Sequence, residues 1–123
     1  MGKLEVIARW ILALILLFFG SNAFHNFLPA PEMSGKIATF TEGMMVTGYF
    51  FPFLGIVMVL VGLSIIFNKW VSLALIILAP VSINIILYHL FLDLATILPG
   101  LIVFLLNLYL GIVHFDAYRP MFD

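Results

Sequence analysis

The chain has 123 residues, of which 65% are hydrophobic and only 9% charged, with a net charge of −1. A soluble domain carries about 25% charged residues, so a water-soluble fold of this length could not bury so much apolar surface. We therefore expect the lipid bilayer to be the solvent for most of the chain, and no nucleic-acid partner. The absence of cysteine excludes disulfides, thiolate metal sites and thiol redox chemistry.

The first apolar stretch covers residues 4–24. Lys3, the apolar run and Ser21-Asn22-Ala23 together resemble a secretory signal with its cleavage site. We interpret the stretch instead as a retained first membrane span.

Three further apolar stretches cover residues 46–67, 70–91 and 96–115. Each is close to the roughly 20 residues that a helix needs to cross a bilayer, and in lipid a helix satisfies its own backbone hydrogen bonds. Asn68-Lys69 leaves room only for a tight turn, so its flanking helices are antiparallel neighbours. The sequence predicts an all-α membrane protein, an antiparallel four-transmembrane-helix bundle that forms a single domain over residues 1–123.

The long connection between the first two spans carries apolar residues at helical spacing, namely Met33, Ile37, Phe40 and Met44. Such a stripe predicts a short amphipathic helix in the first outer loop, either on the membrane surface or over the mouth of the bundle.

Basic residues give the orientation. Lys3, Arg9, Lys69 and Arg119 fall on one side of a four-span topology, and only Lys36 falls on the other. The positive-inside rule places both termini in the cytoplasm. We expect a multi-pass protein of the bacterial cytoplasmic (inner) membrane.

Small residues form a stripe in the second span, where Gly48, Gly55 and Gly62 recur every seven residues. Small residues allow close approach of a second helix in lipid. The stripe predicts either packing within the chain or a homo-oligomer interface.

Polar residues also interrupt the apolar spans. Gly100, Asn107 and His114 share one face of the fourth span, which should point into the bundle. Asn107 is interpreted as an interhelical hydrogen-bonding group or a ligand-binding residue. Glu5 and Arg9, four residues apart, are interpreted as a mutually neutralising pair.

Antiparallel threading predicts a polar cluster at the outer end of the bundle, at one depth: Asn22, His25, Tyr49, His89 and Asp93. His89 and Asp93 are four residues apart and could hydrogen-bond, while Asn84 lies deeper and faces another neighbour. Ionisable groups at membrane depth suggest function. The cluster could bind a small molecule or quinone, or be purely structural. Metal or haem is the weakest alternative because no helix carries two histidines at ligand spacing.

The order of several motifs resembles the DoxX family of small four-helix membrane proteins. The resemblance covers about residues 5–120. At the end of the first span and the start of the second it is carried by Phe19-Gly20-Ser21-Asn22 followed by Phe24, by Phe27-Leu28-Pro29 with Pro31, and by Thr47-Gly48-Tyr49 with Pro52 and Gly55. In the third span and the tail it is carried by Ala79-Pro80-Val81 with Asn84, by Tyr88-His89-Leu90-Phe91-Leu92-Asp93, and by Ala117-Tyr118-Arg119-Pro120. It implies a four-helix bundle with an extended first outer loop. It also implies pocket residues at Asn22, Asn84, His89 and Asp93.

The family name derives from a relative in thiosulfate:quinone oxidoreductase. Many relatives carry a glutamate where this chain has Met58, which weakens the expectation of proton-coupled redox chemistry. We expect a membrane accessory or binding protein, a subunit or partner of a larger membrane system. Its polar pocket would hold a lipid-soluble ligand. The alternative is a quinone-linked oxidoreductase component. No complete catalytic constellation is present, so the sequence does not decide whether the chain is an enzyme.

Overall fold

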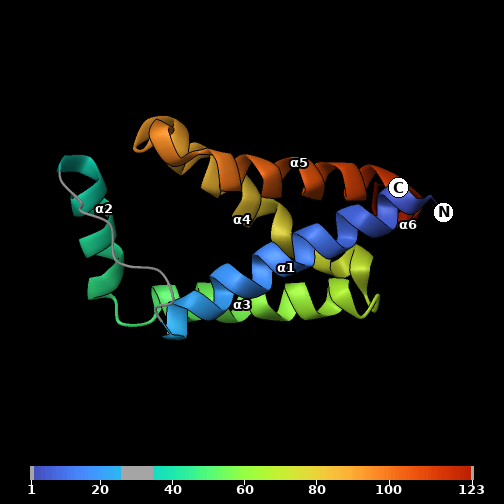
Figure 1. Ribbon diagram of the computed structural model, residues 1–123, viewed down its shortest axis with the longest axis horizontal. Helices are drawn as coiled ribbons and strands as arrows, with labels where there is room; N and C mark the ends of the chain where they lie inside the picture. Colours follow the sequence, from blue (N-terminus) through green and yellow to red (C-terminus); the bar gives the residue numbers. More distant parts are fainter. Residues whose placement is uncertain (1, 26–34, 123) are drawn as a thin grey trace.

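The computed structural model describes the backbone of residues 2–25 and 35–122, and the side chains of residues 2–22 and 35–122. Over these residues the chain is all-helical and contains no strand, as the sequence predicted. The main helices are α1 (Lys3–His25), α2 (Gly35–Val46), α3 (Phe50–Ile66), α4 (Val71–Phe91) and α5 (Leu98–Val113), with the short elements η1 (Leu94–Thr96), α6 (Phe115–Tyr118) and η2 (Arg119–Phe122). Both marked chain ends lie at one end of the long axis and α2 lies at the other (Figure 1). We call these the proximal end and the distal end.

Helices α1 and α3 pack closely along their length because small residues face the partner helix. A Cβ on Gly20 of α1 would lie 3.0 Å from Met58 Cβ and 3.1 Å from the carbonyl oxygen of Gly55. A Cβ on Gly62 would lie 3.0 Å from Leu17 Cγ. The face of α3 with Gly55 and Gly62 therefore packs within the chain.

The predicted seven-residue glycine stripe is wrong at Gly48. This residue lies in the turn before α3 with φ +76°, a conformation that favours glycine. The expected second span starts too early for the same reason: Val46 ends α2, and Thr47 Oγ1 accepts a hydrogen bond from the backbone N–H of Phe50 at 3.1 Å. This contact satisfies a free donor at the start of α3.

Helix α4 follows α3 through the predicted tight turn. Asn68 and Trp70 adopt left-handed conformations (φ 57° and 55°), and the N–H of Lys69 donates to the carbonyl of Ser64 at 2.9 Å. Helix α4 then packs against α5, whose first turn contains Pro99. Proline fits there because the first N–H groups of a helix have no intrahelical partner.

The short helix expected in the outer loop is present as α2, although Met33 lies outside the described residues. Helix α2 is bent by 87° from α3. Ile37, Phe40, Thr41 and Met44 are half-buried, while the intervening charged residues are exposed. The rings of Phe40 and Tyr88 lie 5.2 Å apart, so the half-covered face of α2 reaches α4.

Apolar side chains cover the outside of the helices as well as the core. Leu12, Leu16, Leu78 and Leu110 are fully buried, yet Leu4, Leu60, Leu73, Leu105 and Ile112 are more than half exposed. By length and composition α1 and α4 are each able to cross a membrane. The α2–α3 and α5–α6/η2 pairs meet the same test only as bent units, with bends of 87° and 74°. The described residues thus contain two to four candidate spans.

Candidate functional site

A cavity of about 550 Å³ lies at the distal end between α2, α3 and α4. Its lining residues are Phe40 and Thr41 of α2, Phe50, Phe51, Phe53 and Leu54 of α3, and Pro80, Val81, Asn84, Ile85, Tyr88 and His89 of α4. We call it the distal cavity. Four phenylalanines and several aliphatic residues make it apolar, and α4 supplies most of its polar groups. Pockets of this size and character, roughly 300–1,000 Å³, commonly hold small organic molecules.

His89 is held in the wall of this cavity by the chain that follows α4. Its Nδ1 lies 3.1 Å from the carbonyl oxygen of Asp93 and 3.3 Å from Oγ1 of Thr96. The Thr96 hydroxyl donates to the Asp93 carboxylate at 2.6 Å. The predicted pairing of His89 with Asp93 therefore runs through the backbone carbonyl, because the carboxylate already accepts the proton of Thr96.

The other predicted cluster residues do not all reach the distal cavity. Asn84 lines it beside His89, although the sequence suggested that the two face different neighbours. Tyr49 is 64% exposed and does not line it, and Asn22 is half-buried near the end of α1 and does not line it either. Figure 1 shows the distal ends of α1 and α4 well apart. His25 ends α1, and its side chain lies outside the described residues.

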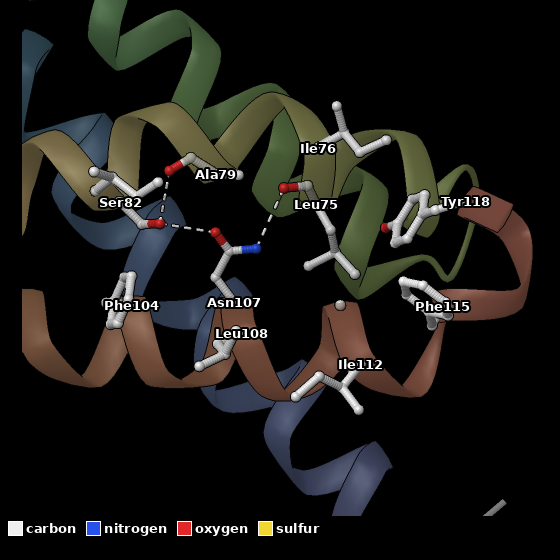
Figure 2. A pocket seen from close by; sticks show the side chains of 12 residues that line it. Leu75, Ile76, Ala79, Ser82, Phe104, Asn107, Leu108, Ile112, Phe115 and Tyr118 are labelled. Atoms are coloured by element: carbon white, nitrogen blue, oxygen red, sulfur yellow. Dashed lines mark hydrogen bonds between the residues drawn. The ribbon is translucent and has the colours of Figure 1, made fainter. Parts of the chain in front are cut away.

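Asn107 lies in a second hollow, a groove of about 380 Å³ between α4 and α5 (Figure 2). Its side chain points from α5 to α4, where its Oδ1 accepts from Ser82 Oγ at 2.8 Å. Its Nδ2 donates to the carbonyl of Leu75 at 3.2 Å. These contacts occupy both ends of the amide, so Asn107 joins the two helices, as one of its two sequence interpretations expected.

The predicted ion pair between Glu5 and Arg9 is not formed. Glu5 is buried, and its Oε1 lies 3.9 Å from Nε2 of His114 at the end of α5. Nε of Arg9 is buried and has no hydrogen-bond partner among the described residues. Intrahelical spacing suggested the pair, but the convergence of α1 and α5 at the proximal end supplies Glu5 with a closer partner.

Sequence reasoning missed Ser82 and Thr96. Ser82 lies seven residues before His89, so both lie on the face of α4 that meets α5, which is a signal that could have identified it. Thr96 lies three residues after Asp93, a spacing typical of local side-chain hydrogen bonds in turns. Within the described residues, no group of three or more His, Asp and Glu side chains could hold a metal ion.

Comparisons with protein-family models, curated proteins and solved structures gave no match. The candidate site therefore rests on the geometry of this chain.

Proposed function

We propose that α1, α3, α4 and α5 each cross a lipid bilayer and that the chain is an integral membrane protein. The exposed leucines and isoleucines on all four helices support this proposal, because water would not solvate so much apolar surface favourably. Helices α3 and α5 have only 17 and 16 residues. They would therefore span a thin region of the bilayer or draw on their bent neighbours for the remaining length.

We further propose that both termini face the cytoplasm and that the membrane is a bacterial inner membrane. The distribution of basic residues supports this orientation. Membership of the DoxX family is also proposed, on the order and spacing of the sequence motifs alone.

Within this arrangement, we propose that the protein binds a lipid-soluble ligand in the distal cavity and acts as an accessory subunit or partner of a larger membrane system. The observation that carries the proposal is the combination of an aromatic wall with Asn84, Tyr88 and His89 on the opposite helix. Such a cavity suits an amphipathic molecule, whose apolar body would contact the phenylalanines while its polar end meets α4.

The proposal is tested by filling the cavity. Asn84→Trp would place a large ring in the distal cavity, whereas Leu87→Trp adds the same ring at an exposed position of α4 that does not line it. The solubilised wild-type protein and both variants are compared by native mass spectrometry and by analysis of their organic extracts. We expect a lipophilic molecule with the wild type and Leu87→Trp but not with Asn84→Trp. Identical empty spectra for all three proteins would overturn the proposal.

The alternative function, a quinone-linked oxidoreductase component, would use the same cavity. Asn84 can donate to a quinone carbonyl, which is the observation that favours it. Titration with decylubiquinone, followed by native mass spectrometry, tests this function. Saturable binding that Asn84→Leu abolishes would support it, and no binding would leave the broader lipid-soluble class.

A further inference from the structure

Asn84 lies in the middle of the wall that α4 contributes to the distal cavity. Lining residues of α4 recur at the spacing of a single helix face, namely Pro80, Val81, Asn84, Ile85 and Tyr88. Asn84 is exposed, although its lining neighbours Val81 and Ile85 are half-buried. Within a helix the exposed part of a residue is mainly its side chain, so the carboxamide of Asn84 borders the cavity.

The carboxamide of Asn84 has no hydrogen-bond partner in the described part of the chain, whereas both ends of the Asn107 carboxamide are paired. Asn84 lies seven residues before Phe91, the last residue of α4, which corresponds to about 10 Å along the helix axis. In the proposed transmembrane arrangement this depth is within the hydrocarbon, which offers neither a donor nor an acceptor. A bound molecule that pairs with the carboxamide there gains affinity, because an unpaired polar group in hydrocarbon is unfavourable.

We infer that the distal cavity selects a molecule whose polar end carries a hydrogen-bond donor and an acceptor side by side, namely a carboxamide or a protonated carboxylic acid on an apolar body. The inference rests on the proposed binding function and specifies its ligand class. The Nδ2–H groups of Asn84 only donate and its Oδ1 only accepts, so such an end group pairs with both. An ester, ether or quinone oxygen would pair with Nδ2–H alone and leave Oδ1 unpaired.

The other polar residues of the lining do not make this distinction. The hydroxyls of Thr41 and Tyr88 can each donate or accept, so they serve either kind of molecule. Nδ1 of His89 is already paired with the turn after α4, and the Cδ2–Nε2 edge of its ring lies against α5. The preference for a donor beside an acceptor is therefore assigned to Asn84.

The test uses two probes with the same apolar tail and the same carbonyl acceptor, dodecanamide and N,N-dimethyldodecanamide. Only dodecanamide carries N–H donors for Oδ1 of Asn84. Equilibrium binding of each probe to the full chain in nanodiscs is measured, with empty nanodiscs subtracted. We expect the affinity ratio of dodecanamide to its dimethyl analogue to be about five-fold higher for the wild type than for Asn84→Leu, as one neutral hydrogen bond implies. Comparison of this ratio between proteins cancels the different sizes of the probes and their different partitioning into lipid.

The variants separate the carboxamide from its surroundings. Asn84→Leu replaces it with an apolar side chain of similar size and removes no hydrogen bond of the described chain, so the bundle should stay folded. Leu87→Asn adds a carboxamide at an exposed position of α4 that does not line the cavity, and it should keep the wild-type ratio. Circular dichroism shows whether each variant is folded, and Asn84→Ala, which also lacks the carboxamide, replaces Asn84→Leu if that variant does not fold.

The outcomes distinguish this inference from the proposed function. Equal ratios for the wild type and Asn84→Leu, or a ratio that Leu87→Asn lowers equally, would overturn the selection and leave the binding function standing. Equal ratios together with a wild type that is dimeric by native mass spectrometry, and monomeric as Asn84→Leu, would assign the carboxamide to a second copy of the chain instead. Failure of both probes to bind the wild type would overturn both proposals.

Discussion

Glu5 and His114 join the first turn of α1 to the end of α5, with Glu5 Oε1 3.9 Å from His114 Nε2. Nδ1 of His114 lies 2.9 Å from the carbonyl of Leu110, so Nδ1 carries a proton. Nε2 of His114 therefore faces the Glu5 carboxylate at a distance longer than a hydrogen bond.

Removal of the carboxylate should weaken the proximal end. Glu5→Leu leaves the half-buried His114 without its partner, and we expect the free energy of unfolding to fall by about 1–3 kcal/mol. Glu42→Leu changes an exposed carboxylate on α2 and should alter it by less than about 0.5 kcal/mol. Unfolding in mixed detergent–SDS micelles, followed by circular dichroism, measures both. Equal unfolding midpoints for the wild type and Glu5→Leu would show that the contact between Glu5 and His114 contributes nothing to stability.

The contact between Asn107 and Ser82 should stabilise the packing of α4 against α5. Asn107→Leu removes both interhelical hydrogen bonds, and we expect a loss of about 1–2 kcal/mol. Asn84→Leu, at an exposed position of α4, is the matched control. A double-mutant cycle with Ser82→Ala isolates the pair. Strict additivity in that cycle would argue against the coupling.

The glycines of α1 and α5 should respond oppositely to alanine. Gly20→Ala brings its Cβ to 3.1 Å from the backbone oxygen of Gly55, which cannot rotate away, so α1 and α3 must separate. We expect a destabilisation of about 1–3 kcal/mol. Gly111→Ala meets nothing within 4 Å and should be neutral or stabilising by up to about 1 kcal/mol, because alanine favours a helix. The same micelle titration compares them, and a tolerant Gly20→Ala would contradict the close packing.

The proposed topology is testable because the chain has no cysteine. Single cysteines at Lys36 and Lys69, which are both exposed, provide matched reporters at the two ends of the bundle. An impermeant maleimide applied to intact cells should label Lys36→Cys, and should label Lys69→Cys only after permeabilisation. The reverse pattern would invert the orientation, and labelling of both in intact cells would place the two ends on the same side.

Tyr118 should give the proximal end a pH-dependent stability. Its hydroxyl donates to the carbonyl of Ser72 at 2.7 Å, and burial raises the pKa of Tyr118 above the usual tyrosine value. Because the pKa of Tyr118 is higher in the folded than in the unfolded chain, the stability that its neutral hydroxyl contributes is fully present below about pH 10. This stability is lost as the pH rises further. Tyr118→Phe should therefore cost about 1 kcal/mol at pH 8, and this difference should vanish in strong alkali.

Tyr49→Phe is the control for Tyr118, because the Tyr49 side chain is 64% exposed. Thermal or SDS unfolding of both variants across alkaline pH provides the measurement. A Tyr118→Phe difference that grows with pH would contradict the assigned direction.

The helices could be predicted from the sequence because their signals are local. Apolar length, the Asn68-Lys69 turn and the Phe40 stripe predicted α1, α4, α5 and α2 to within a few residues. The start of α3 was misplaced because hydropathy does not distinguish Val46 in one helix from Phe50 in the next. The positive φ of Gly48 and the hydrogen bond that the Thr47 hydroxyl accepts separate α2 from α3.

The amino-acid sequence by itself determined that the chain is helical, that its surface is apolar, and which polar residues interrupt that surface. Only the tertiary structure decided how those polar groups are paired. Glu5 meets His114 instead of Arg9, and the Asp93 carboxylate accepts from Thr96 while His89 takes the carbonyl. The physical reason is that a hydrogen bond tolerates a change of only a few tenths of an ångström in the donor–acceptor distance. That distance is set where helices distant in sequence converge. Spacing along one helix constrains only the face on which a residue lies.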